Sequence, residues 1–349
     1  MTGPVTAVQD TSRAGLISGF LAGAGWQDSV LFWLPGDASF RRYARLTRGS
    51  ETAMLMDAPP PLEDVRPFLA VAEHLLRLGQ RAPRILARDE QAGLLLLEDF
   101  GDTTFTRALA ASAPEEPLYR DALDLLIGLH RHANASTIDL PPYDDALLLR
   151  EAHLLTDWYL PAVAPAFASG ADIEAARAGL TAALTPLLAL ARQVPQTLVL
   201  RDYHVDNLML LPGIQPGDGP RGLGLLDFQD AVIGPVTYDL VSLLEDARRD
   251  VPPALAATLL ARYAAAFPEI DPAALDLSCR IMGAQRSMKI VGIFTRLSRR
   301  DGKHRYLTHI PRLWRLIARD LDHPALAPLS AWLDAAIPPE IRTTPETPA

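Results

Sequence analysis

The segment 200–208 reads Leu-Arg-Asp-Tyr-His-Val-Asp-Asn-Leu and places an aspartate and an asparagine in a polar loop between two apolar stretches. Asp202 is a candidate to orient an acceptor hydroxyl and take its proton, because phosphoryl transfer needs a carboxylate within hydrogen-bond reach of the attacking oxygen. Asn207 offers an amide oxygen, a ligand type that suits Mg²⁺. The same two residues would also suit a simple turn between strands.

A second carboxylate, Asp227, ends the short apolar stretch 224–226. Aspartates at strand ends often only terminate the strand. Here, however, a short Gly- and Pro-rich excursion (212–222) separates this stretch from the Asp202 loop, so two adjacent β segments would bring Asp227 beside Asn207. An aspartate, an asparagine and phosphate oxygens would together complete a magnesium shell.

The elements that must position these residues fall into two groups. Residues 1–98 are expected to form a small β-rich lobe with a five-stranded sheet. Its predicted strands lie near residues 29–34, 40–46, 52–57, 84–87 and 94–97, and its predicted helices over residues 12–21 and 63–78. A tight turn over residues 36–39 is expected to join the first two strands.

After residues 98–102 the sequence becomes mainly helical, so the second lobe is assigned to residues 99–337 and the fold class to α+β with a bilobal architecture. Helices are expected over residues 118–132, 146–159, 173–192, 238–246, 253–267, 273–297 and 310–321. Short β segments are expected at residues 198–200 with 208–210, and at 224–226. Residues 338–349 are rich in Pro, Thr and Glu and are expected to be a disordered tail.

Composition limits the kinds of partner that the chain can have. Its 349 residues are 49% hydrophobic, which suits a large core, and its net charge of −9 argues against a nucleic-acid partner. The single cysteine, Cys279, cannot form an internal disulfide, and a cytoplasmic location is expected. No signal peptide and no long uncharged apolar stretch is evident, so no membrane association is expected.

Several motifs resemble the aminoglycoside phosphotransferase-like kinase superfamily over nearly the whole chain. They are the Asp202 and Asn207 pair, Leu-Asp-Phe at 226–228, Gly-Pro at 234–235 and Tyr-Asp-Leu at 238–240. The resemblance implies a protein-kinase-like fold that uses ATP and Mg²⁺. It implies that Asp202 is the catalytic base, that Asn207 and Asp227 hold the metal, and that Asp239 braces the catalytic loop.

Three further motifs, at residues 36–43, 56–60 and 227–231, are similar to those of bacterial anomeric sugar kinases. Such enzymes phosphorylate the C1 hydroxyl of N-acetylmuramate and N-acetylglucosamine in cell-wall recycling. The resemblance implies a small amino sugar as substrate. The enzyme is expected to be a monomer. Two alternatives stay open: a kinase of another small molecule (an aminoglycoside, an amino alcohol or homoserine), and a catalytically inactive nucleotide-binding partner protein.

The sequence departs from the superfamily pattern in the third strand, where Met56 stands at the position of the lysine that grips the ATP phosphates. Because alternate residues of a strand share a face, Ser39, Arg41 and Tyr43 are expected to face the nucleotide, and Arg41 could replace the lysine. The alternative is an ordinary solvated face. Glu73 would either orient that cation or lie exposed.

The link between the lobes supplies the remaining ATP contacts. Glu98 and Phe100 lie where backbone groups would meet adenine, an assignment that depends on position and not on residue type.

The acceptor side is expected to combine polar groups with an apolar floor. Candidate substrate contacts are Glu151, Gln229, Asp230, Gln285, Arg286 and Lys289. Gln285 and Lys289 are four residues apart on an expected helix and would share a face, with Arg286 beside it. A basic contact here would suit the lactyl carboxylate of N-acetylmuramate, whereas the alternative is a solvated helix face.

Overall fold

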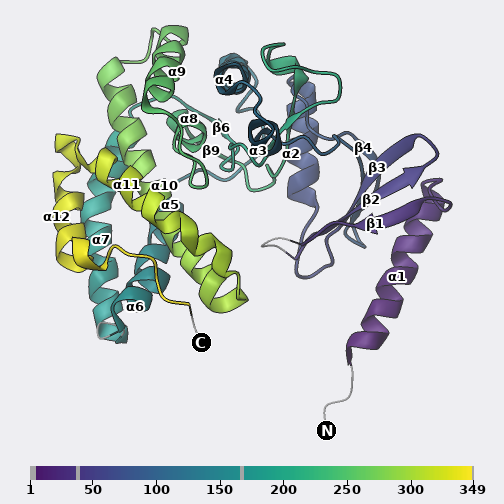
Figure 1. The fold of residues 1–349 in the computed structure, drawn as a ribbon, viewed down its shortest axis with the longest axis horizontal. Coiled ribbons are helices and arrows are strands. Elements are labelled where there is room, and N and C mark those ends of the chain that lie inside the picture. The colour runs from purple at the N-terminus through teal and green to yellow at the C-terminus, as the bar shows by residue number, and fades with distance from the viewer. Residues whose placement is uncertain (1–4, 37–39, 166–168, 348–349) are drawn as a thin grey trace.

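The computed structural model describes residues 5–36, 40–165 and 169–347, which form a small β-rich lobe and a large helical lobe (Figure 1). The small lobe holds a five-stranded antiparallel sheet with the order β1-β2-β3-β5-β4. Its elements are α1 (Val5–Gly23), β1 (Val30–Trp33), β2 (Arg42–Arg48), β3 (Glu51–Asp57), α2 (Arg66–Arg77), β4 (Ile85–Asp89) and β5 (Leu94–Glu98). The α+β fold class and the five strands predicted for this lobe are confirmed.

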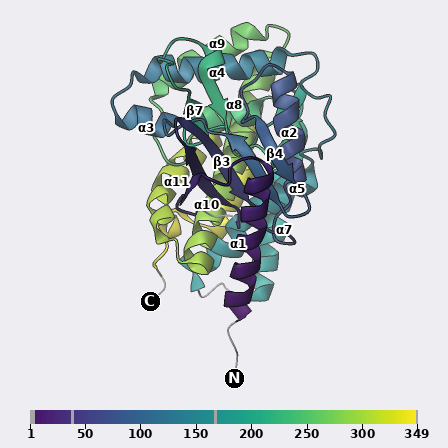
Figure 2. The ribbon, with the colours of Figure 1, turned by 90° about the vertical axis from the view of Figure 1, so that its right-hand side faces the viewer.

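The two faces of the sheet bury different partners. One face packs against α1, which crosses in front of the sheet in Figure 2. Its core contains Ile17, Leu21, Trp26, Ala44, Leu46, Ala53, Leu55, Leu94 and Leu96. The opposite face contributes Met56, Leu95 and Leu97 to the main core, which continues through α2 into the large lobe. This division follows from strand geometry, because successive side chains point to opposite faces.

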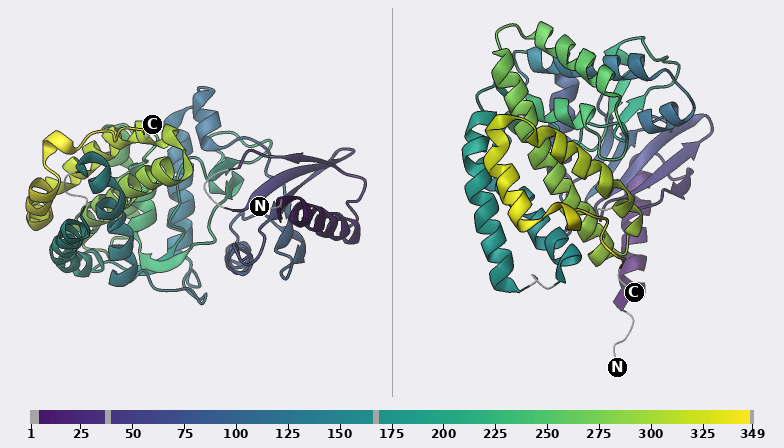
Figure 3. Two further views of the ribbon diagram at one scale, coloured as in Figure 1. Left: turned by 90° about the horizontal axis from the view of Figure 1, so that it is seen from below. Right: turned by 60° about the vertical axis from the view of Figure 1, so that its left-hand side comes forward.

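The large lobe is built from helices that surround the long helix α10 (Figure 3). Its α-helices are α3 (Phe105–Ala110), α4 (Glu115–Arg131), α5 (Asp145–Ala152), α6 (Leu160–Val163), α7 (Gly170–Ala191), α8 (Thr237–Leu244), α9 (Pro253–Ala266), α10 (Pro272–Asp301), α11 (Ile310–Leu321) and α12 (Ala327–Ala336). A π-helical turn over Leu155–Tyr159 packs closely on α10, since a Cβ at Gly292 would lie 2.2 Å from the backbone of Leu154. The sequence did not predict α3, α6 or α12.

Two short sheets interrupt the helices. β6 (Gln196–Val199) pairs with β9 (Val232–Pro235), and β7 (Leu208–Leu210) pairs with β8 (Leu223–Leu225). The expectation that residues 198–200 and 208–210 form one β unit was therefore wrong, because each stretch finds its partner farther along the chain. The loop between β6 and β7 consequently spans two sheets and is held at both ends.

The C-terminal segment corrects another prediction, because residues 338–347 pack on the large lobe instead of forming a disordered tail. The hydroxyl of Tyr159 donates to the carbonyls of Ile341 and Thr343, at 2.9 and 2.8 Å. Arg342 donates to the carbonyl of Ile337 at 2.7 Å and bonds Asp334. Composition alone suggested disorder, whereas these tertiary contacts fix the segment.

Helix α7 has the length and mean hydropathy, 1.3, of a helix able to cross a membrane. In the structure it packs against α10, α12 and α5, and it buries Leu180, Leu184, Leu187 and Leu188. Length and composition of a single helix are weak evidence for a membrane span. The expectation of no membrane association stays a prediction.

Candidate active site

The catalytic loop lies between β6 and β7, where backbone hydrogen bonds fix its shape. The buried carboxylate of Asp239, on α8, accepts hydrogen bonds from the backbone N–H of Leu200 at 2.6 Å and of Arg201 at 2.9 Å. Arg201 has a φ of 70°, a left-handed conformation that is costly for a residue with a side chain. Asp239 therefore braces the backbone that presents Asp202, as the resemblance implied.

Asn207 closes the other end of this loop. Its side-chain amide donates to the backbone carbonyl of Asp202 at 3.0 Å, and its backbone carbonyl accepts from the backbone N–H of Leu226 at 3.0 Å. Because the nitrogen and oxygen of an amide diverge, the bond to Asp202 directs the Asn207 oxygen away from the loop backbone. The second bond places the end of β8 beside the loop, which is the juxtaposition expected from the sequence.

Asp227 lies two residues after the end of β8 and has a φ of 57°, another left-handed residue in the site. The next residue, Phe228, is fully buried and stacks on Phe68 of α2, with ring centroids 5.0 Å apart. The side-chain amide of Gln229 donates to Asp227 at 2.9 Å and to Asp230 at 3.1 Å. The packing of Phe228 fixes the backbone that turns Asp227 toward the catalytic loop.

The two acids of the site have opposite pKa shifts. Burial would raise the pKa of Asp202, but the positive charges of Lys289, His204 and Arg286 outweigh it, and the pKa is lowered. Burial and the negative charge of Asp202 raise the pKa of Asp227, against a smaller opposing effect of Arg41. The surroundings therefore favour the ionised form of Asp202 and disfavour that of Asp227.

The residues around Asp227 fit a magnesium ion. Among the described residues no group of three or more His, Cys, Asp or Glu could enclose a metal, so a closed protein cage is not present in them. Mg²⁺ in kinase sites needs no such cage, because one or two carboxylates and the substrate phosphates supply its ligands. Asn207 and Asp227 would hold the ion, and the pKa of Asp227 is raised in spite of the nearby Arg41 and Gln229, so a further cation would be favourable there.

The small lobe contributes Arg41 to the same site. A guanidinium nitrogen of Arg41 lies 3.7 Å from Asp227, and another lies 3.7 Å from Glu63. Tyr43 lies close by, and burial raises its pKa to about 12. Arg42 points to the other side, where it pairs with the buried Asp57 and stacks over Trp33 at 4.6 Å. The alternation expected for this strand is present, with Arg41 and Tyr43 toward the site.

The other small-lobe residues lie farther from the chemistry. Glu73 pairs with Arg88 at 3.1 Å on the surface and does not reach Arg41. Met56 is fully buried in the core and offers no charge. Ser39 lies outside the described residues.

Glu98 and Phe100, at the link between the lobes, do not line the cavity that Asp202, Asn207 and Asp227 share, but line another of about 320 Å³. Glu98 binds Arg81 and Arg84 through its carboxylate, and its backbone N–H donates to the Arg84 carbonyl at 2.9 Å. Phe100 packs on Met209 and Leu211. The backbone N–H of Glu98 is therefore not available to adenine in this structure, because it already donates to the carbonyl of Arg84, the residue before β4.

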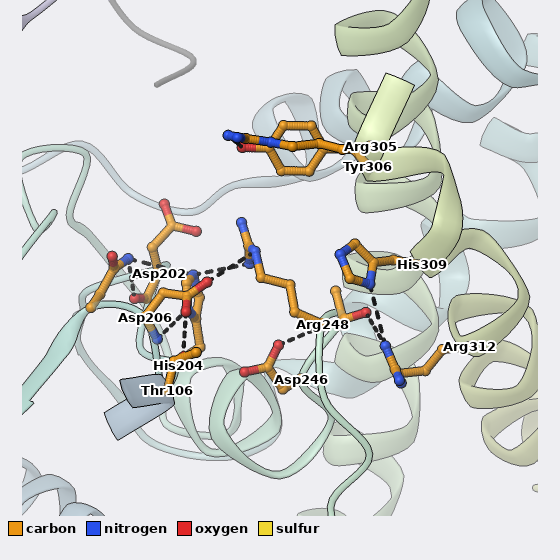
Figure 4. A network of polar contacts seen from close by, with 12 residues as sticks. Thr106, Asp202, His204, Asp206, Asp246, Arg248, Arg305, Tyr306, His309 and Arg312 are labelled. Atoms are coloured by element: carbon orange, nitrogen blue, oxygen red, sulfur yellow. Dashed lines mark hydrogen bonds and ion pairs between the residues drawn. The ribbon is translucent and has the colours of Figure 1, made fainter. Parts of the chain in front are cut away.

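Asp202, Asn207 and Asp227 line one cavity of about 520 Å³. Its apolar wall consists of Ile290, Ile293, Phe294, Leu297 and Tyr306, and its basic groups are Arg248, Arg286, Lys289 and Arg305. Arg248 lies between the catalytic loop and His309 in Figure 4, and its Nε is 3.2 Å from Asp206. The cavity thus joins an acidic catalytic end to an apolar and basic acceptor end.

The face of α10 in this cavity differs from the expected one. Arg286 and Lys289 line it together with the apolar residues one and two turns later, whereas Gln285 is fully buried and donates to the carbonyl of Leu148 at 3.0 Å. The spacing of four residues between Gln285 and Lys289 predicts that Gln285 lies on the cavity face. In the structure the neighbouring residue, Arg286, takes that place. The apolar spacing of Ile290, Ile293 and Leu297 was the signal that could have corrected it.

Glu151, predicted to bind sugar hydroxyls, lies behind the cavity wall and supports it. Its carboxylate pairs with Lys289 at 3.0 Å and with Arg201, and it accepts a bond from Tyr143. Gln229 and Asp230 likewise do not line the cavity, and Gln229 instead orients Asp227. Glu151 therefore fixes a cation of the wall in place.

The sequence reading missed four groups of the cavity wall: Arg248, Arg305, Tyr306 and His309. They come from the segment after α8 and from the 3₁₀ turn His304–His309 after α10. Neither segment carries a motif, and only the folding of α10 against them brings them to Asp202. No local pattern in the sequence would have identified them.

A bilobal fold in which an aspartate, an asparagine of the same loop and a strand-end aspartate line one cavity is the arrangement expected of a kinase. The model of the phosphotransferase enzyme family matches residues 34–276, and the chain belongs to that family. The chain is a kinase of this family.

Curated relatives match over most of the chain. An N-acetylmuramate/N-acetylglucosamine kinase of Caulobacter vibrioides is 38% identical over 95% of this chain and 99% of its own length. A protein of the same name from Pseudomonas aeruginosa is 40% identical over 90% of this chain and 91% of its own.

Solved structures share the fold at low identity. A microcompartment-associated aminopropanol kinase has a TM-score of 0.60 at 14% identity and covers 90% of this chain and 99% of its own. An ADP-bound aminoglycoside phosphotransferase has a TM-score of 0.56 at 12% identity, covering 89% of this chain and 99% of its own. These similarities establish the protein-kinase-like fold.

Proposed function

We propose that this protein transfers the γ-phosphate of ATP to the C1 hydroxyl of N-acetylmuramate and N-acetylglucosamine, in the recycling of peptidoglycan sugars. The observation that carries the proposal is the single cavity in which Asp202, Asn207 and Asp227 face an apolar and basic wall. Its volume of about 520 Å³ suits one sugar. The names of the curated relatives support the choice of acceptor.

In this reaction Asp202 accepts the proton of the anomeric hydroxyl while that oxygen bonds to the γ-phosphorus. The bond from the γ-phosphorus to the bridging oxygen breaks, and ADP leaves. The lowered pKa of Asp202 keeps its carboxylate ionised, as a proton acceptor must be. A bound Mg²⁺ would neutralise charge on the phosphates, and Asn207 and Asp227 are the residues that would hold it.

Arg41 is proposed to provide the phosphate contact that Met56 cannot. It lies 3.7 Å from Asp227, so its guanidinium is beside the site where a metal-bound phosphate would lie. A guanidinium forms strong charge-assisted hydrogen bonds to phosphate oxygens. This position supports an active enzyme over an inactive nucleotide-binding protein.

The charge of the cavity disfavours acceptors that carry positive charge. Pockets for aminoglycosides or choline require carboxylates or aromatic cages around the acceptor. Here the lining acids, Asp202, Asp206 and Asp227, all belong to the catalytic end, whereas the acceptor end carries Arg286, Lys289 and Arg305. The basic wall therefore favours a neutral or anionic acceptor.

The test measures ADP release with ATP, Mg²⁺ and each of the two free sugars, and locates the phosphate on the product by phosphorus–proton NMR coupling. We expect turnover with both sugars and a phosphate on C1. The 1-O-methyl glycosides are the matched controls, because they lack the C1 hydroxyl and should not react. Phosphate on another carbon, or turnover only with amino alcohols or aminoglycosides, would refute the proposal.

A further inference from the structure

The cations of the acceptor cavity differ in how their charge is compensated. Lys289 is paired with Glu151 at 3.0 Å, and Arg248 with Asp206 at 3.2 Å. Arg286 has no carboxylate within 4.0 Å in the part of the chain that the structure describes, and its one polar contact is a long hydrogen bond of 3.5 Å to the carbonyl of Glu245. Arg286 thus lacks the acidic partner that its neighbours have.

Arg286 is also the most deeply buried of these cations, with 3% of its surface exposed. A buried guanidinium without an ionic partner is costly, because the protein replaces little of its hydration. Helix α10 could accommodate an apolar residue at this position, as it does at Ile290 and Phe294 on the same face. The charge therefore indicates a partner that arrives with the ligand.

The position of Arg286 restricts which part of the ligand it can contact. Arg286 and Asp202 line the same cavity, and the charge of Arg286 helps to lower the pKa of Asp202. A sugar with its C1 hydroxyl at Asp202 would have its other substituents in the rest of this cavity, which residues of α10 line. Arg305 lies at the exposed mouth of the cavity, its guanidinium 5.0 Å from the ring of Tyr306.

We propose that Arg286 binds the carboxylate of the 3-O-lactyl group, the feature that distinguishes N-acetylmuramate from N-acetylglucosamine. This inference rests on the proposed function and names the residue that selects between its two acceptors. A guanidinium matches a carboxylate through two parallel hydrogen bonds, which gives direction as well as charge. N-acetylglucosamine leaves Arg286 without this partner and is therefore the weaker substrate.

The experiment compares Arg286→Met with the wild type, using both sugars at saturating ATP. We expect kcat/KM for N-acetylmuramate to fall about tenfold or more, mainly through KM, because a charge-assisted contact is lost. For N-acetylglucosamine we expect the KM to change within about twofold, since it makes no such contact. Any loss of kcat that comes from the weaker positive charge beside Asp202 should be the same for both sugars. Thermal unfolding checks that the variant is folded.

Arg315→Met is the matched control, because it removes the same charge from an exposed residue that pairs with Asp250 and does not line the cavity. It should change neither sugar's kinetics. If Arg286→Met does not fold, Arg286→Gln takes its place with the same expected selectivity, and retained turnover of N-acetylglucosamine shows that the site is intact.

The outcomes separate this inference from the proposed function. An equal rise in KM for both sugars would overturn the inference, because the contact would then not be with the lactyl group. An unchanged preference between the sugars would overturn it too. If the wild type phosphorylates neither sugar, the proposed function fails, and the inference fails with it.

Discussion

The two ends of the active-site cavity are built in different ways. At the catalytic end, Asp202 and Asp227 sit on short loops, held by backbone hydrogen bonds and by left-handed residues such as Arg201. At the acceptor end, Arg286 and Lys289 project from one regular helix, α10. A side chain on that helix can be exchanged without altering the backbone that holds the catalytic residues. The two ends are coupled through charge, since Lys289 and Arg286 lower the pKa of Asp202.

The largest effect is expected from Asp227→Asn, which removes the charge that would hold the metal. Turnover should fall about 10³-fold or more, because several kcal/mol of charge stabilisation on the phosphates is lost. Steady-state kinetics over a range of Mg²⁺ concentrations is the measurement, with thermal unfolding as the control for folding. Near-normal kcat at saturating Mg²⁺ would show that Asp227 does not hold the metal.

A smaller loss is expected from Asp202→Asn, which keeps the shape of the loop and removes the proton acceptor. The turnover number should fall about 10²–10⁴-fold, the usual share of a general base. ATP affinity measured by calorimetry should be unchanged, because Asp202 is assigned to the acceptor. Loss of ATP affinity with normal turnover would reverse this assignment.

Arg41→Ala tests the small lobe's contribution to the catalytic end, and Arg42→Ala is its matched control on the opposite face of the strand. Arg41→Ala should raise the KM for ATP and lower kcat/KM about tenfold or more, the value of a charge-assisted contact to phosphate. The KM for sugar should be unchanged. Arg42→Ala should act on stability instead, because Arg42 pairs with the buried Asp57. A larger loss of ATP use in Arg42→Ala would contradict the observed strand orientation.

The smallest expected effect is that of ionic strength on the KM for each of the two sugars. Raising salt from about 0.05 M to about 0.5 M shortens the Debye length and screens exposed charges such as Arg305. The KM for the anionic N-acetylmuramate should rise about two- to threefold relative to that for neutral N-acetylglucosamine, at saturating ATP. Equal KM changes for the two sugars would argue against a basic acceptor end.

Local pattern predicted much of the small lobe and of the catalytic end. The alternation of strand residues correctly placed Arg41 and Tyr43 on one face and Arg42 on the other. The positions of Asp202 and Asp227 were recognisable because in each case polar residues follow a short apolar stretch. Their proximity followed from a short connection, which limits how far the two segments can separate.

Prediction failed where long-range packing decided the outcome. Residues 198–200 and 208–210 both read as strands, but their pairing with β9 and β8 depends on contacts across the lobe. Gln285 and Arg286 are adjacent, polar and equally suited to a helix surface, yet one is buried against Leu148 and the other lines the cavity. A helix sequence gives its periodicity, and the neighbours of the helix decide which face each residue takes.

The sequence by itself determined the residues that can perform the chemistry, because carboxylate and amide groups at the ends of apolar segments are local features. Only the tertiary structure decided which cations surround the acceptor. Arg248 and Arg305 lie on segments far apart in the chain and meet Arg286 through the packing of α10. It also decided that Glu151 compensates Lys289 and leaves Arg286 without an acid, since ion pairing depends on distance in space and not on spacing in the chain.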